Sequence, residues 1–245
     1  MNINILFDGL SLGAIYALIA LGYTMVYGIA KMLNFAHGDI IMVGAYAILC
    51  TLNVAGNPIV SLVAAIVICT AMGVLVEKIA YKPLRGASPL AVLITAIGVS
   101  YFLQGLAQLI FGSASRQVSH LYLGTFGLGG VEINKGTVVT LVVGGILMVA
   151  LTLFVKKTRT GRAMLAVSED KGAAQLMGVN VNRIIMITFA IGSALAAFAG
   201  LFYLMSIPSV NPTLGAMPGI KAFTAAVIGG IGSIPGAMLG GILLG

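Results

Sequence analysis

The chain has 245 residues, of which 60% are hydrophobic and only 8% are charged. Soluble domains carry roughly 45–50% apolar and about 25% charged residues, so the composition excludes a soluble globular protein and indicates a polytopic membrane protein. The net charge of +7 does not indicate a nucleic-acid partner, because the basic residues lie between apolar runs, where they set membrane topology.

Apolar runs long enough to cross a lipid bilayer as helices need about 17–25 residues. The runs, in chain order, cover residues 5–29, 40–55, 59–76, 90–111, 137–155, 184–207 and 223–245. The first run lacks the basic start and the cleavage site of a signal peptide, so we expect it to be retained. We predict an all-α polytopic membrane protein, a bundle of about seven or eight transmembrane helices, some of them broken or re-entrant.

Basic residues are distributed unequally between alternate loops. One side carries ten of them and the other side three, and the richer side is expected to face the cytoplasm. This alternation places the N-terminus outside, provided that residues 40–55 cross the bilayer fully; a re-entrant segment there would place it inside. The richer side holds Lys31, Lys78, Lys82, Arg85, Lys156, Lys157, Arg159, Arg162, Lys171 and Arg183, and the other side Arg116, Lys135 and Lys221.

The stretch LNFAHGDIIMVGAY, residues 33–46, places Asn34, His37 and Asp39 directly before an apolar run. A metal site or an acid–base pair would need further ligands or a nucleophile, and none stands near in the sequence. We expect a polar break near the ends of two spans, with Asp39 in the first turn of the second helix, where the helix dipole favours an acid. Lining the route of a solute is the alternative, and a catalytic His37 is the least favoured interpretation.

Between residues 155 and 184 lies the longest polar stretch, with helical start and stop signals of its own. Ser168 is a candidate N-cap, followed by Glu169 and Asp170 in the first turn. Gly178 suits the left-handed position that ends a helix, and Asn182 is a candidate cap for the next span. Ala163, Met164 and Val167 share one helical face, so we favour docking to a separate cytoplasmic protein over packing on the membrane domain alone.

Small residues recur at a spacing of four, which allows close contact between helices in a membrane. We expect most of these faces to pack within the subunit, with a pore-lining or dimer-contact face as the alternative. Near the end, Pro235 within GGIGSIPG is expected to break the last helix, and broken membrane helices usually line a cavity. The repeats are Gly232, Gly236 and Gly240; Gly192, Ala196 and Gly200; and Gly9 and Gly13.

Three long motifs occur in order: LSLGAIYALIALGYTMVYGIAKMLNFAHGDIIMVGAY, GRAMLAVSEDKGAAQLMGVNVNR and GIKAFTAAVIGGIGSIPGAMLGG. Together they resemble the permeases of high-affinity branched-chain amino-acid importers of the ATP-binding-cassette (ABC) class, most closely the H-type subunit. The resemblance implies a multi-pass protein of the bacterial inner membrane that pairs with a homologous second permease. It also implies two cytoplasmic ABC ATPase subunits and a periplasmic binding protein that delivers leucine, isoleucine or valine.

The resemblance implies that residues 156–183 form a coupling segment seated in the ATPases, and that the motif at 33–46 lies beside the solute pathway. Residues 1–245 are interpreted as a single permease domain, truncated at the C-terminus because the family continues past GAMLGG. The implied coupling residues are Gly161, Arg162, Ala163, Glu169, Asp170, Ala174 and Gly178. The candidate pathway residues are Asn34, His37, Asp39, Lys221, Gly232 and Pro235.

The sequence does not favour ATP hydrolysis or other catalysis by this chain. No Gly-Lys dipeptide occurs, so a Walker A loop is absent and ATP hydrolysis is expected from separate subunits. The G-x-S-x-G pattern at residues 9–13 sits in an apolar helical run rather than at a strand-to-helix turn, and His37 and His120 are the bases on offer, so an enzyme is not favoured. We predict no cofactor and no metal site, because Cys50 and Cys69 lie inside apolar runs.

An ion-coupled carrier or channel is a second alternative, disfavoured because the middle of every run is uncharged. A permease for another small neutral solute, such as urea, an amide or a sugar, is the alternative substrate class. Lys221 is expected at the outer membrane surface, where a snorkelling side chain is favoured over contact with a substrate carboxylate.

Overall fold

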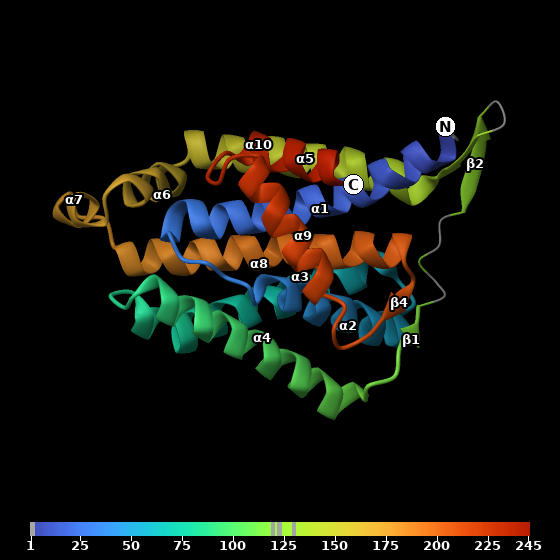
Figure 1. Ribbon diagram of the computed structural model, residues 1–245, viewed down its shortest axis with the longest axis horizontal. Coiled ribbons are helices and arrows are strands. Elements are labelled where there is room, and N and C mark those ends of the chain that lie inside the picture. The colour runs from blue at the N-terminus through green and yellow to red at the C-terminus, as the bar shows by residue number, and fades with distance from the viewer. Residues whose placement is uncertain (1–2, 119–120, 122–123, 129–130) are drawn as a thin grey trace.

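The computed structural model describes residues 3–118, 121, 124–128 and 131–245 as a bundle of helices that share one long direction (Figure 1). Two antiparallel strand pairs, β1 with β4 and β2 with β3, lie at one end of the bundle. The helices are α1 (Ile3–Ala30), α2 (His37–Ala55), α3 (Pro58–Val76), η1 (Glu77–Tyr81), η2 (Lys82–Leu84), α4 (Pro89–Phe111), α5 (Lys135–Lys157), α6 (Arg159–Glu169), α7 (Lys171–Leu176), α8 (Val181–Ser206), α9 (Ala216–Ile228) and α10 (Ile234–Leu244), and the strands are β1 (Arg116–Gln117), β2 (Thr125–Leu128), β3 (Val131–Asn134) and β4 (Ser209–Val210).

Six helices in the described part of the chain are long and apolar enough to cross a bilayer. This confirms the predicted all-α polytopic membrane class. The last apolar run forms two shorter helices, α9 and α10, separated by a turn. A break at this place was expected from Pro235, but that proline lies in the first turn of α10, where its missing N–H costs nothing.

The two ends of the bundle differ in charge and in structure. The helices α6 and α7 project at the end where α1, α3 and α5 finish, and the strand pairs lie at the opposite end (Figure 1). Lys156 and Lys157 end α5 beside α6, and Arg85 follows α3 at the same end. We call this the cytoplasmic end and the opposite one the outer end, as the distribution of basic residues predicts.

The segment between α1 and α2 turns back into the bundle. His37, the first residue of α2, contacts Gly22, which lies about 12 Å before the end of α1 at 1.5 Å per residue. The expectation that His37 and Asp39 lie near the membrane surface is therefore wrong: residues 31–36 re-enter, and α2 begins inside. From there α2 runs to the outer end of the bundle. The start of α1 lies at the same end (Figure 1).

A second segment, residues 211–215, turns back from the outer end and leads into α9. The starts of α2 and α9 meet, with Gly38 backbone to backbone against Gly215. A Cβ atom on either glycine would overlap the other's carbonyl group. Only glycine at both positions allows two broken helices to begin side by side.

Two antiparallel central helices, α1 and α8, cross where Gly22 lies next to Gly192. Each is followed by a re-entrant loop, a helix that begins inside the bundle, and a helix with proline in its first turn: Pro58 in α3 and Pro235 in α10. In addition, α1 packs against α9 and α10, as α8 packs against α2 and α3. The molecule thus contains two structural repeats of opposite orientation, a plan found in many membrane transporters.

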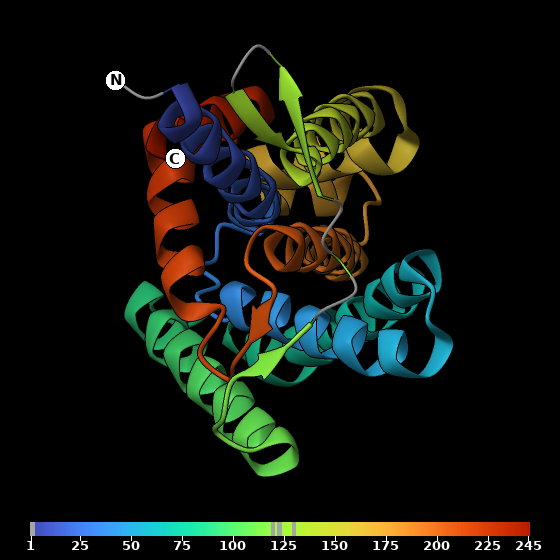
Figure 2. The same cartoon turned by 90° about the vertical axis from the view of Figure 1, so that its right-hand side faces the viewer.

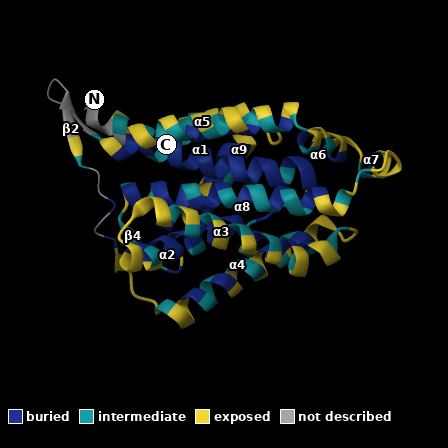
Figure 3. Ribbon diagram, turned by 180° about the vertical axis from the view of Figure 1, so that it is seen from behind, coloured by how far each residue is buried: buried dark blue, intermediate teal, exposed yellow. Residues whose placement is uncertain are grey.

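The four-residue repeats of small side chains are used mainly inside the chain, as predicted. Gly200 faces α2, and Gly13 faces α10. Gly232 is an exception, because it lies in the turn before α10 with a φ of 99° rather than on a helix face with Gly236. The helices α3, α4 and α5 carry apolar side chains on their outside (Figure 3), as expected for surfaces that face lipid.

Candidate functional site

Three polar side chains from the re-entrant segment lie inside the helix bundle. Asn34 is 3% exposed, and His37 and Asp39 are each 1% exposed. We call these three residues the buried polar cluster. Polar groups at this depth are costly unless they form hydrogen bonds or serve a function.

Asn34 is fixed by a hydrogen bond from another helix. The hydroxyl group of Tyr81, at the cytoplasmic end of η1, donates to Asn34 Oδ1 over 2.8 Å. The Asn34 Nδ2 group is buried and has no partner among the described residues. Tyr81 itself packs on Phe189 of α8, with 5.1 Å between the ring centroids. Through Tyr81, the Asn34 side chain thus connects the re-entrant loop to η1 and α8.

His37 fills the space that Gly22 leaves open between α1 and α8. A Cβ atom at Gly22 would overlap the imidazole ring. The ring meets Tyr23 edge to face, with 4.9 Å between the centroids, and neither ring nitrogen has a partner among the described residues. No nucleophile contacts it there, so the geometry favours packing over a catalytic base. The second candidate base, His120, lies outside the described residues.

Asp39 faces a different neighbour. Gln104 Nε2 of α4 donates to Asp39 Oδ1 over 2.9 Å and to Ser100 Oγ over 3.2 Å. These three side chains line a cavity of about 540 Å³ between α2, α4 and α9. The rest of its wall is mainly apolar and aromatic, formed by Tyr23, Phe35, Leu93, Ile97, Tyr101, Ala216 and Ile220.

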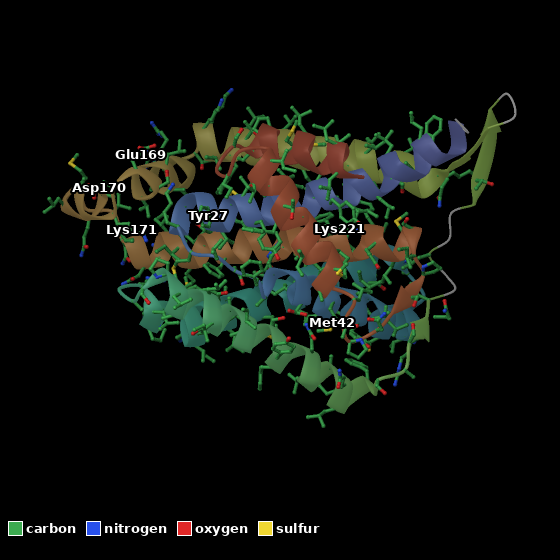
Figure 4. All side chains as sticks on the ribbon, in the orientation of Figure 1. Tyr27, Met42, Glu169, Asp170, Lys171 and Lys221 are labelled. Atoms are coloured by element: carbon green, nitrogen blue, oxygen red, sulfur yellow. The ribbon has the colours of Figure 1, made fainter. Side chains whose placement is uncertain are left out.

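The remaining candidate pathway residues do not join this cavity. Lys221 is exposed on α9, midway along the length of the bundle (Figure 4), and its ammonium group is 3.4 Å from Tyr16 Oη and 5.4 Å from the centre of the Tyr16 ring. The expected position at the outer surface is therefore wrong, because the re-entrant loop carries α9 inward before Lys221. Gly232 and Pro235 are exposed at the turn between α9 and α10, and Gly232 lies beside Gly28 of α1.

Sequence reasoning missed Ser100 and Gln104. Both stand inside the apolar run of α4, four residues apart, and therefore on one face of the helix. That spacing was a usable signal, since uncharged polar residues inside a membrane helix usually face another helix or a cavity. Their partner could not be predicted, because Asp39 was expected near the membrane surface.

The predicted coupling segment forms two short helices at the cytoplasmic end (Figure 1), which is the end farthest from the viewer in Figure 2. Gly161, in the first turn of α6, packs against the backbone of Phe154 and Val155 so closely that a Cβ atom would overlap it. Arg162 is exposed and Ala163 half-buried. Met164 and Val167 are buried, which confirms the predicted apolar face but places it against the membrane domain.

The caps of these helices differ from prediction. Glu169 and Asp170 lie at the junction of α6 and α7 (Figure 4), and Asp170, rather than Ser168, is the N-cap of α7. Its Oδ1 atom accepts hydrogen bonds from Gly172 N (2.7 Å) and Ala173 N (3.0 Å). Ser168 instead donates to the carbonyl group of Leu165 within α6.

The end of α7 matches its predicted signal, whereas the start of α8 does not. Gly178 has a φ of 82° and donates to Gln175 O, as expected for the residue that ends a helix. Asn180, and not Asn182, caps α8 by accepting from Arg183 N. Ala174 is the buried residue of α7.

The outermost part of α7 exposes apolar side chains to water. Leu176 is 90% exposed and Met177 84% exposed. We call these two residues the α7 tip. Adjacent exposed apolar side chains at the far end of a molecule are typical of a surface that binds another protein.

Three polar contacts join the cytoplasmic segment and its surroundings to the bundle. Lys171 Nζ donates to the carbonyl oxygen of Ala30, the last residue of α1, over 2.9 Å. Partial burial, together with the positive charges of Arg85 and Lys31, lowers the pKa of the Lys171 ammonium group. Arg85 in turn pairs with Glu77 and donates to Asn182.

No group of three or more potential metal ligands occurs among the described residues. Cys69 is buried and donates weakly to Ile40 O over 3.4 Å, whereas Cys50 is exposed on α2.

Comparisons with known proteins agree on one family. A family described as "Branched-chain amino acid transport system / permease component" matches residues 5–245. The chain is 46% identical to the high-affinity branched-chain amino acid transport system permease protein BraD of Pseudomonas aeruginosa, over 98% of this chain and 83% of that protein. It is 44% identical to the corresponding protein LivH of Escherichia coli, over 98% of this chain and 82% of that one. A probable branched-chain amino acid permease of Methanocaldococcus jannaschii is 31% identical over 93% of this chain and 74% of its own length. No solved structure matches the chain.

Proposed function

This chain belongs to the family of permease components of branched-chain amino acid transport systems, and we propose that it translocates leucine, isoleucine and valine as the membrane-spanning subunit of an ABC importer. It is a multi-pass permease of the bacterial inner membrane. The observation that carries the proposed substrate is the identity of 46% and 44%, over nearly the whole chain, with two permeases named for these amino acids.

The cavity beside Asp39 supports this substrate class. Its volume of about 540 Å³ is in the range of small-molecule sites, and its wall combines a few polar groups with a larger apolar surface. A sugar or an amide would call for a wall with more hydrogen-bonding groups. Branched aliphatic side chains suit Leu93, Ile97 and Ile220.

The partners belong to the same proposal. We infer that two cytoplasmic ABC ATPases bind residues 156–183, that a homologous second permease completes the pathway, and that a periplasmic binding protein delivers the amino acid. The apolar face of α6 is buried in the chain, but the α7 tip is exposed, and an exposed apolar pair supports a bound partner at the cytoplasmic end. The residues proposed to couple the permease to the ATPases are Gly161, Arg162, Ala163, Glu169, Asp170, Ala174 and Gly178.

The decisive experiment is reconstitution of the permease pair and the ATPases in proteoliposomes. We expect leucine-loaded binding protein to stimulate ATP hydrolysis and leucine uptake together. Stimulation by a sugar-loaded binding protein instead would reject the proposed substrate. Failure of any ATPase to co-purify with the full-length permease would reject the ABC assignment.

Charge at the coupling segment provides a narrower test. Reversal of charge at Glu169 and Asp170 is expected to uncouple ATP hydrolysis from uptake while membrane insertion continues. Asp170→Asn is the matched control, because asparagine removes the charge but keeps an N-cap acceptor. A β-branched residue at Gly178, where φ is 82°, is expected to disturb the same segment through backbone strain. Wild-type transport in the charge-reversal and Gly178 variants would reduce the segment to a connector.

A further inference from the structure

The carboxyl group of Asp39 is held in a defined position inside the bundle. It is 1% exposed by residue, and Gln104 Nε2 donates to its Oδ1 atom over 2.9 Å. The same amide nitrogen lies 3.2 Å from Ser100 Oγ. Two polar residues of α4 therefore orient one acid of α2, in a region where the other wall residues are largely apolar.

A carboxylate within a membrane needs a positive partner or a proton, since its charge is poorly solvated there. Among the residues that the structure describes, the one ion pair is that of Arg85 with Glu77, at the cytoplasmic end. Lys221, the basic residue on neighbouring α9, is directed to Tyr16. Within the described part of the chain, no lysine or arginine side chain forms an ion pair with Asp39.

The space in front of Asp39 shows what kind of cation would fit. The cavity of about 540 Å³ has Asp39, Ser100 and Gln104 on its wall, and the aliphatic side chains Leu93, Ile97 and Ile220 lie on the same wall beside Ala216 and the aromatic rings of Tyr23, Phe35 and Tyr101. A metal ion would be favoured by several charged oxygen ligands, and Asp39 is the one carboxylate that the described residues place on this wall. An organic ammonium group attached to an aliphatic chain matches both parts of the wall.

We propose that Asp39, positioned by Gln104, binds the α-ammonium group of the transported amino acid at an intramembrane site, while the aliphatic side chain lies against Leu93, Ile97 and Ile220. This inference rests on the proposed function and deepens it. Asp39 is the contact residue, and Gln104 is a positioning residue that keeps one carboxylate oxygen bonded while the other remains free for the ammonium group.

The test uses the complete permease–ATPase complex in lipid nanodiscs without binding protein, so that only the membrane site selects. Three probes are compared by thermal unfolding: leucine, 3-methylbutylamine, which lacks the carboxylate, and 4-methylpentanoate, which lacks the amine. We expect leucine and 3-methylbutylamine to raise the midpoint and 4-methylpentanoate to leave it unchanged. Equal effects of the amine and the acid, or no effect of any probe, would overturn the proposal without the use of any variant.

Variants then locate the site. In Asp39→Asn, which preserves size and shape, we expect the shift caused by 3-methylbutylamine to disappear and leucine uptake to fall at least tenfold. In Gln104→Leu we expect a weaker loss, with a raised KM and a smaller change in kcat. Gln108→Leu is the matched control, because it makes the same substitution one turn further along α4, at a residue that does not line the cavity. This variant should keep wild-type uptake.

Two outcomes separate the site from the function. If the wild-type complex takes up leucine and Asp39→Asn does so with unchanged KM and rate, the site is rejected and the proposed function stands. If the wild-type complex fails to take up leucine, the proposed function is rejected first. Uptake that depends on a sodium or proton gradient, with no response to 3-methylbutylamine, would assign Asp39 to an inorganic cation and overturn the ammonium site.

Discussion

The buried polar cluster and the α7 tip reverse the usual distribution of side chains in opposite ways. Inside the bundle, Asn34, His37 and Asp39 are between 1% and 3% exposed, whereas at the cytoplasmic end Leu176 and Met177 are 84–90% exposed. Stability alone favours the reverse arrangement in both places, because polar groups are costly inside a membrane and apolar groups in water. Their positions are consistent with the proposed roles, a solute site beside Asp39 and a partner surface at the α7 tip.

The largest effect is expected from a variant that disturbs the buried polar cluster. Valine at Gly38 would place side-chain atoms against the Gly215 carbonyl and the Gly219 backbone, which forces the starts of α2 and α9 apart and displaces Asp39. We expect uptake to be lost and the permease to be destabilised by about 3 kcal/mol, as measured by thermal unfolding in nanodiscs.

Gly98→Val in α4 is the control for this variant, because nothing lies within 4 Å of a Cβ atom there. It should unfold at nearly the wild-type temperature. A Gly38→Val permease as stable as the control would contradict the close contact between the two broken helices.

The next largest effect addresses the exposed side. Replacing both Leu176 and Met177 by serine removes apolar surface that a partner would bury, and we expect the affinity for the ATPases to fall about tenfold or more. The unfolding temperature of the isolated permease should not fall, since both side chains are already in water. Gln175→Ala, on the same helix, is the control, and equal loss of affinity there would show that position rather than apolar surface matters.

Tyr81→Phe sharpens the comparison by removing one hydrogen bond from the buried polar cluster while its packing on Phe189 is kept. The side-chain oxygen Oδ1 of Asn34 would then be buried without its donor, at a cost of about 1–3 kcal/mol. Chemical or thermal unfolding measures the loss. Tyr27→Phe is the matched control, because no side-chain hydrogen bond of Tyr27 is found among the described residues; a loss of equal size in both variants would contradict the role of the Asn34 contact.

The smallest effect concerns how the α7 tip is held. Asp170→Ala removes the acceptor of two backbone N–H groups and should destabilise α7 by about 1 kcal/mol, seen as faster amide exchange at Gly172 and Ala173. Ser168→Ala should leave these amides unchanged, since Ser168 bonds within α6. The opposite ranking would restore Ser168 as the cap.

Much of the fold follows from hydropathy, but depth within the membrane does not. The apolar runs located the long helices to within a few residues, and the basic loops predicted which end faces the cytoplasm. The run at 40–55 carries no sign that its polar start lies inside the bundle. That position depends on the contact of Gly38 with Gly215, two glycines far apart in the sequence, and no local pattern reports it.

For the same reason, the sequence predicted only part of the candidate site. Asp39 was selected from its sequence context, but its partner Gln104 lies on another helix and was not. At the cytoplasmic segment, Ser168 and Asp170 both have the chemistry of an N-cap. The choice between them depends on where α6 ends, which is set by the packing of Met164 and Val167 and not by propensity. Lys221 was misplaced because an inward loop precedes it.

The bond from Lys171 to Ala30 gives the molecule a short mechanical connection between its two unusual regions. Lys171 begins α7, and Ala30 is the last residue of α1, from which the chain runs within a few residues to Asn34 and Asp39. If α7 moves when a partner binds, this bond would carry the displacement to the terminal carbonyl group of α1 and so to the loop that leads to the buried acid. A movement at the cytoplasmic surface could then reach the middle of the membrane without a movement of the whole bundle.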